Sequence, residues 1–415
     1  MSDLSSAIDR RQFLLSSAGV LAATAILPDV SEAALRRIAL PVNIGIVGCG
    51  RQGRAIMTEL AKLDNVKVLA VCDTDGKRAE NASKRVPGAK PYTGITEMIA
   101  GHKEMTAAIV ATPTHLHKEP VLALLAAGKH VYCEAPLAHT IVDAKAIAMA
   151  ARGSKSLFAC GFEGRSNPVY KLARTFFRSD AVRDPVGVEL KQYQKTSWRF
   201  PSSEPSREAA ANWRLDKSIS TGLPGEWGSH AFDVTTWYLD KLPRTIRTYG
   251  AIRLHADGRE VHDTVHTVLG YEGGLTARFD GSLANSHEGR FELLRGSNAA
   301  VKLAWTHGWM FKEADAPTQG WEVYANRQQF FNDEGITLIA GATKLAEQGK
   351  LKDGVGLPYS SLYYALADFA ASVADGKPPA CSAAAGLTST VLGILASDSA
   401  NKGIEIVVSP ADLVL

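Results

Sequence analysis

The sequence predicts an α/β protein: an N-terminal doubly wound parallel sheet, then a second α/β domain with a large open, mainly antiparallel sheet. The first domain is indicated by buried β-branched runs that alternate with helical segments over residues 42–161. The second is indicated by consecutive strand-like runs separated by short turns, such as Glu272-Gly273-Gly274. Strands without helices between them favour an antiparallel sheet with one covered and one free face.

The first strand of the N-terminal domain ends in a glycine-rich turn that a helix follows. Residues 43–47 have the pattern of a buried strand, and residues 55–63 have the pattern of the helix. Bare backbone in the turn allows a pyrophosphate to approach closely, and the unpaired N–H groups at the helix start can bind it. The residues of this turn that we expect to bind a dinucleotide are Gly48, Gly50, Arg51, Gln52 and Gly53.

An acidic residue, Asp73, follows the second strand of this unit, residues 66–71. At this position a carboxylate can bind both ribose hydroxyls of an adenosine and repel a 2′-phosphate. The glycine motif alone is weak evidence, but strand, glycines, helix, strand and acid in this order are strong evidence. The unit therefore predicts NAD rather than NADP as the cofactor; the alternative is a glycine-rich turn that binds nothing.

The first domain continues with alternating elements up to residue 161. Strands are expected at residues 107–112, 128–133 and 156–161, and helices at 119–127 and 141–152. Ligands of a doubly wound sheet bind at the carboxyl ends of its strands. The expected cofactor-binding residues in the loops after the strands at 107–112 and 128–133 are Thr112, Pro113, Thr114, His117, Glu134 and Ala135.

Residues 162–415 are expected to form a substrate and oligomerisation domain. Its strands are predicted at residues 186–198, 245–254, 263–271, 275–282, 290–296 and 300–304, with a helix at 230–239. Helices at 359–375 and 383–401 and a strand at 404–408 complete the chain, and the helix at 383–401 is a candidate to pack back on the first domain.

The first 33 residues have the features of an export signal. A twin-arginine pattern, Arg10-Arg11, precedes a moderately apolar run, and Ser31-Glu32-Ala33 is a plausible cleavage site. The run is too short and too polar for a stable membrane anchor. We expect a periplasmic protein that is exported folded around its cofactor; the alternative is a disordered N-terminus that contains two arginines by chance.

Composition excludes several other classes of protein. The five cysteines are odd in number and have no C-x-x-C spacing, which argues against a disulfide framework. No group of histidines and cysteines has metal-ligand spacing, so no metal site is expected. The net charge is only +3 and basic residues do not interleave with aromatic ones in a stripe, so nucleic acid is not an expected partner.

Five blocks of the sequence resemble one family. They are the G-x-G-x-x-G unit, residues 111–117, residues 128–136, residues 222–233, and the C-terminal helix before Gly403. In these blocks the chain is similar to the Gfo/Idh/MocA family of glucose–fructose oxidoreductase and inositol dehydrogenase. The resemblance implies a Rossmann domain followed by an α/β domain with an open sheet. It also implies hydride transfer from a sugar, glycoside or polyol hydroxyl to NAD, and a homo-oligomer formed through the open sheet.

The chain departs from the family pattern at two positions. The family's Glu-Lys-Pro, whose lysine lies near substrate and nicotinamide, reads here Glu134-Ala135-Pro136. The family's aspartate four residues before the substrate-domain histidine is here Glu226, ahead of His230. One helical turn separates these two residues, so the carboxylate could orient the imidazole and raise its basicity. The alternative is a helix start in which Glu226 caps and His230 is buried.

The role of the missing lysine must pass to another group if the chain is a dehydrogenase. Candidates are His230 and Tyr193, together with Lys191 and Lys195 on the same strand as the tyrosine. Tyr193 could equally be a tyrosine that packs on the sheet. Residues with the aromatic and polar character of a sugar site are Trp213, Arg214 and Asp233. The competing reading of the tryptophans is a dimer interface.

The resemblance also places Arg165 at the domain junction near the cofactor; its alternative is a surface charge. Three functions remain open from the sequence. The first is an NAD-dependent sugar or polyol dehydrogenase with a substitute base. The second is a redox-neutral glycosidase, lyase or epimerase that oxidises its substrate transiently, as do relatives that lack the lysine, the NAD-requiring α-N-acetylgalactosaminidases. The third is a non-catalytic protein that binds sugar or cofactor.

Overall fold

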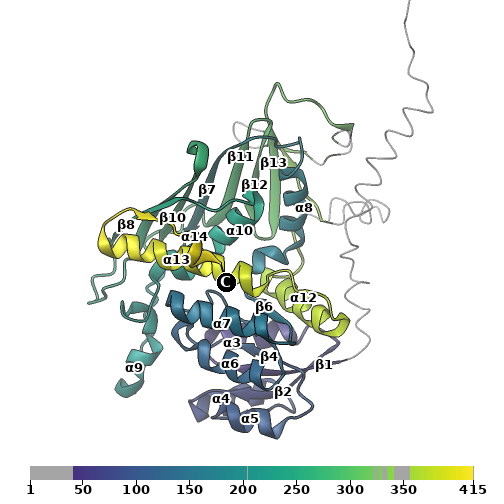
Figure 1. Ribbon diagram of the computed structural model, residues 1–415, viewed down its shortest axis with the longest axis vertical. Coiled ribbons are helices and arrows are strands. Elements are labelled where there is room, and N and C mark those ends of the chain that lie inside the picture. Colours follow the sequence, from purple (N-terminus) through teal and green to yellow (C-terminus); the bar gives the residue numbers. More distant parts are fainter. Residues whose placement is uncertain are drawn as a thin grey trace, which may run out of the picture.

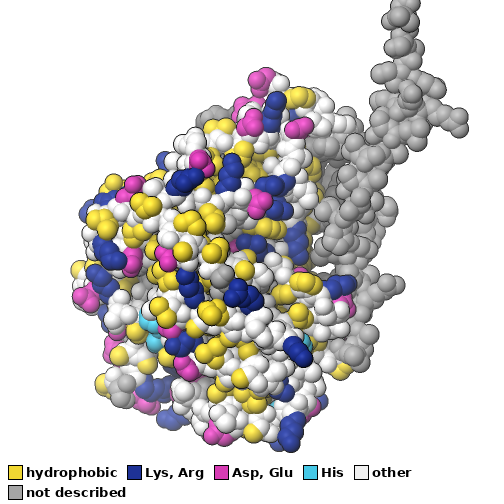
Figure 2. All heavy atoms as spheres, viewed as in Figure 1, with side chains coloured by type: hydrophobic (Ala, Val, Ile, Leu, Met, Phe, Trp, Pro, Cys, Tyr) yellow, Lys and Arg dark blue, Asp and Glu magenta, His cyan; other side chains and the backbone are white. Residues whose placement is uncertain are grey.

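The computed structural model describes residues 41–414 except 203, 321, 323–324, 326, 330–333 and 341–355. The expected export signal, residues 1–33, lies outside the described residues. Two sheets organise the chain, one in the lower and one in the upper half of the molecule, with helices between them (Figure 1). On the face drawn in Figure 2, acidic and basic side chains are interspersed.

The N-terminal sheet is parallel throughout and has the order β3-β2-β1-β4-β5-β6. Its strands are β1 (Val42–Val47), β2 (Val66–Cys72), β3 (Lys90–Tyr92), β4 (Ala107–Val110), β5 (His130–Cys133) and β6 (Phe158–Cys160). The connecting helices are α3 (Arg51–Leu60), α4 (Gly76–Arg85), α5 (Ile95–Gly101), α6 (Lys118–Ala126) and α7 (Ile141–Gly153). The predicted doubly wound sheet is confirmed. The strand order reverses between β1 and β4, so the loops after these two strands meet at one crevice.

The elements α4, β3 and α5 have no counterpart among the elements predicted from the sequence. In α4 only Ala79 and Ala82 are buried, and the remaining residues are polar or small. Strand β3 has three residues, none of them buried. Helix α4 and strand β3 thus bury little apolar surface, whereas α5 has Ile95, Met98 and Ile99 at helical spacing and could have been predicted from this pattern.

The second sheet has ten described strands in the order β14-β15-β13-β12-β11-β7-β10-β9-β8-β16. All its described pairs are antiparallel except β7 with β10, which confirms the mainly antiparallel prediction. The strands are β7 (Pro185–Tyr193), β8 (Thr245–Ala251), β9 (Thr264–Gly270), β10 (Thr276–Ser282), β11 (Arg290–Gly296), β12 (Ala299–Ala304), β13 (His307–Lys312), β14 (Arg327–Gln329), β15 (Glu334–Thr337) and β16 (Ile406–Val407). The first of them ends before Trp198, where the backbone is left-handed with φ of 57°.

Helices cover one face of the second sheet. They are α8 (Pro168–Phe177), α10 (Ser229–Leu239) and α13 (Ala383–Lys402), and Phe232 of α10 meets Phe279 of β10 with ring centroids 5.7 Å apart. On the opposite face, Glu189 of β7 forms ion pairs with Lys191 at 3.0 Å and with Arg295 at 2.9 Å. This is the covered and free arrangement expected of an open sheet. Among the described residues, no helix has the length and apolar character needed to cross a membrane.

Two C-terminal helices connect the halves of the molecule. Helix α12 (Ser361–Asp375) contributes Leu366 and Phe369 to the same buried cluster as Ile44 and Ile109 of the N-terminal sheet. Helix α13 accepts a hydrogen bond from the N–H of Leu137 on the hydroxyl of Thr390, at 2.9 Å. Both helices therefore help to position the loops at the carboxyl end of the parallel sheet.

Candidate functional site

The glycine-rich turn between β1 and α3 leaves an open approach to the helix start. A side chain at Gly48, where φ is 97°, would meet the backbone of Ala111 at 2.5 Å, and one at Gly53 would collide with the carbonyl of Gly48. An added Cβ at Gly50, by contrast, would have no atom within 4 Å. Gly50 precedes the first residue of α3, and no side chain caps the N–H groups there. The turn is tightly packed at Gly48 and Gly53 but open at Gly50, which leaves room for a pyrophosphate at this helix terminus.

Asp73 lies against this turn. Its carboxylate accepts hydrogen bonds from the N–H of Cys49 at 2.9 Å and of Asp75 at 3.0 Å. Burial raises the pKa of Asp73, and the hydrogen bond from Cys49 opposes the rise. Two nearby guanidinium groups, those of Arg78 and Arg207, are both bound by Asp75. A carboxylate beside the turn, with its neighbouring cations already paired, fits an adenosine ribose that carries no 2′-phosphate.

We expect Asp73→Ser to narrow the preference for NAD over NADP, because the substitution removes the negative charge that repels a 2′-phosphate. Titration of the purified protein with each cofactor, followed by protein fluorescence, measures the two dissociation constants. Glu272→Gln, which alters an exposed carboxylate remote from the turn, is the control. An unchanged ratio of the constants in Asp73→Ser would contradict the role given to this carboxylate.

His117 bridges two of the predicted cofactor loops, those after β4 and β5. Its Nε2 lies 2.9 Å from the carbonyl of Thr112, and its Nδ1 lies 3.1 Å from the carbonyl of Pro136. Burial lowers the pKa of His117 to about 4, against the effect of these carbonyls. Because backbone groups face both ring nitrogens, His117 positions the loops around the cofactor site. Glu134, in the second loop, accepts a hydrogen bond from Nε2 of Gln52 at 3.1 Å and so joins this loop to α3.

Glu226 bridges the two domains. It lies in the π-helical turn η4 (Pro224–Gly228) and accepts hydrogen bonds from the hydroxyl of Thr114 at 2.8 Å and from Nε of Arg214 at 3.0 Å. Thr114 follows Pro113 at the start of the 3₁₀ turn η1 (Thr114–Leu116). The carboxylate thus ties a cofactor loop to the substrate domain.

The expectation that Glu226 raises the basicity of His230 is corrected by this geometry. The carboxylate is committed to Arg214 and to threonine hydroxyls. Burial lowers the pKa of His230 to about 3, the positive charge of Arg290 lowers it further, and a hydrogen bond to the backbone of Ala135 opposes both. His230 is therefore a neutral imidazole beside Ala135, where the family resemblance places a lysine.

Tyr193 lies on the other face of the sheet from His230, which corrects its prediction as a catalytic residue. Residue Gln192 of β7 pairs with Arg290 of β11, and Lys191 pairs with Phe291. Directly paired residues share a face and successive residues alternate, so Tyr193 shares the free face with Lys191. Helix α10, which carries His230, covers the opposite face. Lys191 is held by Glu189 and Glu288 on the free face, and Lys195 is exposed to solvent.

The predicted substrate residues fall into two groups. Asp233 is completely buried and binds Arg165 through two nitrogens at 2.9 Å, so its prediction as a substrate ligand is corrected. This ion pair joins the turn η2 (Glu163–Arg165) to α10, and it excludes a purely surface role for Arg165. Trp213 is also buried, with the guanidinium of Arg214 4.3 Å from its ring centroid. The tryptophan supports Arg214, whose side chain is 39% exposed and remains the candidate for ligand contact.

A buried charged cluster that the sequence analysis does not predict lies between η2 and β11. The guanidinium of Arg290 stacks at 3.4 Å from the ring centroid of Trp305, and its Nη2 has no hydrogen-bond partner among the described residues. Glu292 accepts a hydrogen bond from the hydroxyl of Tyr170 at 2.5 Å. Burial raises the pKa of Glu163 to about 7, and Arg290 opposes this rise. Charged residues at alternate positions on the covered face of β11 are the one sequence signal that could have pointed to this cluster.

Burial also raises the pKa of Glu134 to about 8, and the neighbouring Glu163 contributes to this rise. Titratable groups that are shifted toward neutral pH and lie close together are typical of functional sites. The described residues contain no group of three or more histidine, cysteine or acidic side chains arranged to hold a metal ion.

The sequence and the fold now define a class of protein. Residues 42–162 match the NAD-binding Rossmann fold of an oxidoreductase family, and residues 192–302 match the GFO/IDH/MocA C-terminal domain. These two regions cover more than half of the chain. The chain therefore belongs to the Gfo/Idh/MocA family, which includes NAD-binding sugar and polyol dehydrogenases, and its cofactor is NAD.

Several curated proteins are similar to this chain. Inositol 2-dehydrogenase 2 of Saccharopolyspora erythraea is 29% identical over 243 residues, which are 57% of this chain and 65% of that protein. Levoglucosan dehydrogenase of Pseudarthrobacter phenanthrenivorans is 27% identical over 48% of this chain and 52% of that protein. 2,7-Anhydro-N-acetylneuraminate hydratase of Escherichia coli is 23% identical over 63% of this chain and 67% of that protein. These matches span about half to two thirds of the relatives' own length.

Among solved structures, levoglucosan dehydrogenase in complex with NADH and L-sorbose has a TM-score of 0.72. It is 20% identical in sequence, and the match covers 89% of this chain and 99% of that one. An oxidoreductase domain protein from Kribbella flavida has a TM-score of 0.71 and 19% identity, covering 89% and 100% of the two chains. These likenesses establish the two-domain fold.

Proposed function

We propose that this protein oxidises a hydroxyl group of a sugar, glycoside or polyol and that bound NAD receives the hydride. The observation that carries the proposal is a partly exposed imidazole, His230, that lies beside Ala135 in the loop after β5 and that desolvation and the charge of Arg290 keep neutral. The Gly48–Gly53 turn and Asp73 would hold the dinucleotide. Relatives named for inositol and levoglucosan support a carbohydrate substrate.

His230 would act as the base in this reaction. A neutral imidazole can accept the hydroxyl proton as the C–H bond breaks and the carbonyl forms. The cofactor, when bound, supplies the acceptor for the hydride. An alcohol and NAD⁺ thus give a carbonyl compound, NADH and a proton, which His230 accepts and passes on to solvent because its pKa is about 3.

Arg290 would supply the positive charge that the family's lysine provides elsewhere. Alanine at position 135 can neither donate a proton nor carry a charge, whereas the guanidinium of Arg290 lies close enough to His230 to lower its pKa. A guanidinium stays protonated, so it can stabilise a developing alkoxide but cannot act as the base. The two functions of a lysine would therefore be divided between His230 and Arg290.

A second function is a redox-neutral reaction in which the substrate is oxidised, changed and reduced again. The similar hydratase of Escherichia coli favours this alternative, because its name describes a reaction without net oxidation. Both functions require the same first step at His230. A non-catalytic role in binding sugar or cofactor remains the third alternative.

Absorbance at the NADH band, together with product analysis, distinguishes these functions. The protein is incubated with excess NAD and a panel of inositols, hexoses and glycosides, and we expect NADH to accumulate in proportion to oxidised product. Product without accumulated NADH would instead support the redox-neutral reaction. Binding of the sugars without any product would support the non-catalytic alternative and contradict the proposal.

A further inference from the structure

A segment of the substrate domain, here called the strap (residues 197–202 and 204–216), extends to the dinucleotide-binding domain. It contains the helix α9 (Pro205–Ala211) and the 3₁₀ turn η3 (Trp213–Leu215). Figure 1 shows α9 below the second sheet, at the level of the N-terminal domain. Because α9 packs on neither sheet core, its position must be set by the contacts at its two ends and along its length.

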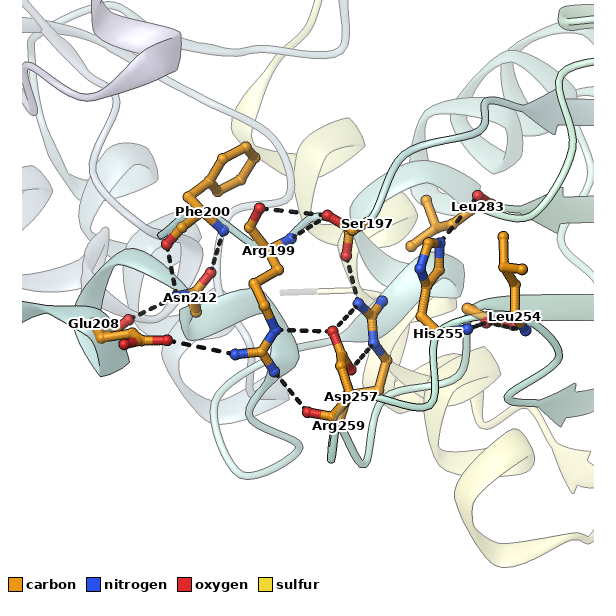
Figure 3. A network of polar contacts seen from close by, with 11 residues as sticks. Ser197, Arg199, Phe200, Glu208, Asn212, Leu254, His255, Asp257, Arg259 and Leu283 are labelled. Atoms are coloured by element: carbon orange, nitrogen blue, oxygen red, sulfur yellow. Dashed lines mark hydrogen bonds and ion pairs between the residues drawn. The ribbon is translucent and has the colours of Figure 1, made fainter. Parts of the chain in front are cut away.

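The start of the strap is fastened to the substrate domain by one carboxylate and two guanidinium groups (Figure 3). Asp257 accepts hydrogen bonds from Nε of Arg199 at 2.8 Å and from Nε of Arg259 at 2.7 Å. Arg259, whose side chain is 1% exposed, also donates to the carbonyl of Ser197 at 2.7 Å. These charge-assisted bonds hold the strap where it leaves the sheet.

A second set of hydrogen bonds joins the two ends of the strap to each other. The side-chain amide of Asn212 accepts from the N–H of Phe200 at 2.6 Å and donates to the carbonyls of Phe200 and Glu208, both at 3.0 Å (Figure 3). The backbone of Phe200 is therefore held in place at both its N–H and its carbonyl group. Beyond Asn212, the bond from Arg214 to Glu226 returns the strap to the cofactor loops.

Between these fastenings the strap contacts the dinucleotide domain at two places. The ring of Phe200 lies under the guanidinium of Arg51, with Cζ 3.7 Å from the ring centroid. Arg207 forms an ion pair with Asp75, and Glu204 forms one with Lys77 at 3.5 Å. The first contact is at the first residue of α3, beside the pyrophosphate position. The second begins two residues after Asp73, beside the ribose position.

We propose that the strap covers the adenosine and pyrophosphate half of bound NAD and slows its dissociation. The contacts of Phe200 with Arg51 and of Arg207 with Asp75 would hold the strap in this closed position. A dinucleotide that lies along the Gly48–Gly53 turn toward Asp73 passes between the two places where the strap touches the domain. For the dinucleotide to dissociate, both the Phe200–Arg51 and the Arg207–Asp75 contacts must then break. The proposal rests on the NAD-binding domain alone and not on the oxidation proposed above.

The dissociation rate of NAD tests whether the strap retains the cofactor. The protein is loaded with the fluorescent analogue etheno-NAD, and the analogue is chased with excess NAD in the absence of any sugar. We expect Phe200→Ala and Arg207→Ala each to raise the dissociation rate about threefold, and the double variant about tenfold. The effect of Arg207→Ala should shrink in high salt, whereas that of Phe200→Ala should persist, because only the former breaks an ion pair.

Arg244→Ala is the matched control, since it removes an exposed arginine paired with Glu272 at 2.7 Å far from the strap. Thermal unfolding of every variant checks that the fold is retained, and Phe200→Leu and Arg207→Gln replace any variant that fails to fold. A dissociation rate of the double variant within twofold of the parent, or equal acceleration by the control, would overturn the proposal. Loss of activity without faster release of etheno-NAD would also count against it.

Discussion

Replacement of His230 by alanine is expected to lower the turnover number by about 100-fold or more, with little change in NAD affinity. The imidazole is the neutral ring beside Ala135, and its removal leaves no positioned group to accept the hydroxyl proton. Because His230 contacts neither the glycine turn nor Asp73, where most of the dinucleotide is expected to bind, the affinity for NAD should change little. Steady-state kinetics and a parallel NAD titration measure both quantities.

The matched control is His266→Ala, which removes a histidine that is 56% exposed and paired with Asp280 on the second sheet. Arg290→Met should also lower turnover strongly, and Arg290→Lys should retain part of it, if a positive charge is what the site requires. Ala135→Lys should not raise activity, because a second buried cation would lie near Arg290 without a carboxylate partner of its own. Brisk NADH formation by Ala135→Lys on a common sugar would mean that the chain is a disabled dehydrogenase.

The free energy of unfolding of the cofactor-free protein is expected to fall as pH rises from about 6.5 to 8. The pKa of Glu134 is about 8 and that of Glu163 about 7 in the fold, against an ordinary value of 4.5. The folded state therefore keeps protons that the unfolded state has released, and it loses stability as these groups ionise. From these shifts the two glutamates together lose about 2 kcal/mol of stabilisation in this window.

Below pH 6.5, protonation of the histidines lowers the free energy of unfolding as pH falls. The pKa values of His230, about 3, and His117, about 4, lie below the ordinary value of 6.5. Their contribution to stability is complete above pH 6.5 and is lost as pH falls toward those values. A variant that lacks only the two glutamates keeps all the histidines, so its difference from the parent between pH 6.5 and 8 isolates Glu134 and Glu163.

Denaturant titrations at several pH values test this dependence. Glu134→Gln combined with Glu163→Gln should flatten the fall between pH 6.5 and 8, whereas Glu272→Gln, at an exposed site, should leave it unchanged. An unaltered slope in the double variant would show that other groups cause the loss of stability.

The dinucleotide-binding half could be predicted from sequence because its signals are local. Strand, glycine turn and helix succeed one another within residues 42–60, and each element has the composition that its own backbone requires. The mainly antiparallel character of the second sheet is also predictable, because its strand and turn signals are local. The pattern does not predict the strands β13, β14 and β15.

The partners of the candidate catalytic residues could not be predicted in this way. Glu226 and His230 are one helical turn apart in sequence, which suggested that they interact, but Glu226 binds Arg214 instead. Arg290 approaches His230 from β11, a strand sixty residues further along the chain, and no motif marks it. Such pairings depend on how distant segments of the second domain pack together, and a linear pattern does not record that.

The packing of α12 has a consequence for synthesis of the chain. Strand β6, which completes the parallel sheet, ends at Cys160, but α12 begins only at Ser361. At ordinary rates of translation, roughly 10 to 40 seconds separate the two. Over that time the layer that contains Ile44 and Ile109 lacks the cover of Leu366 and Phe369. A nascent chain of this length is therefore a natural substrate for holding chaperones, and residues 42–162 produced alone should aggregate more readily than the whole protein.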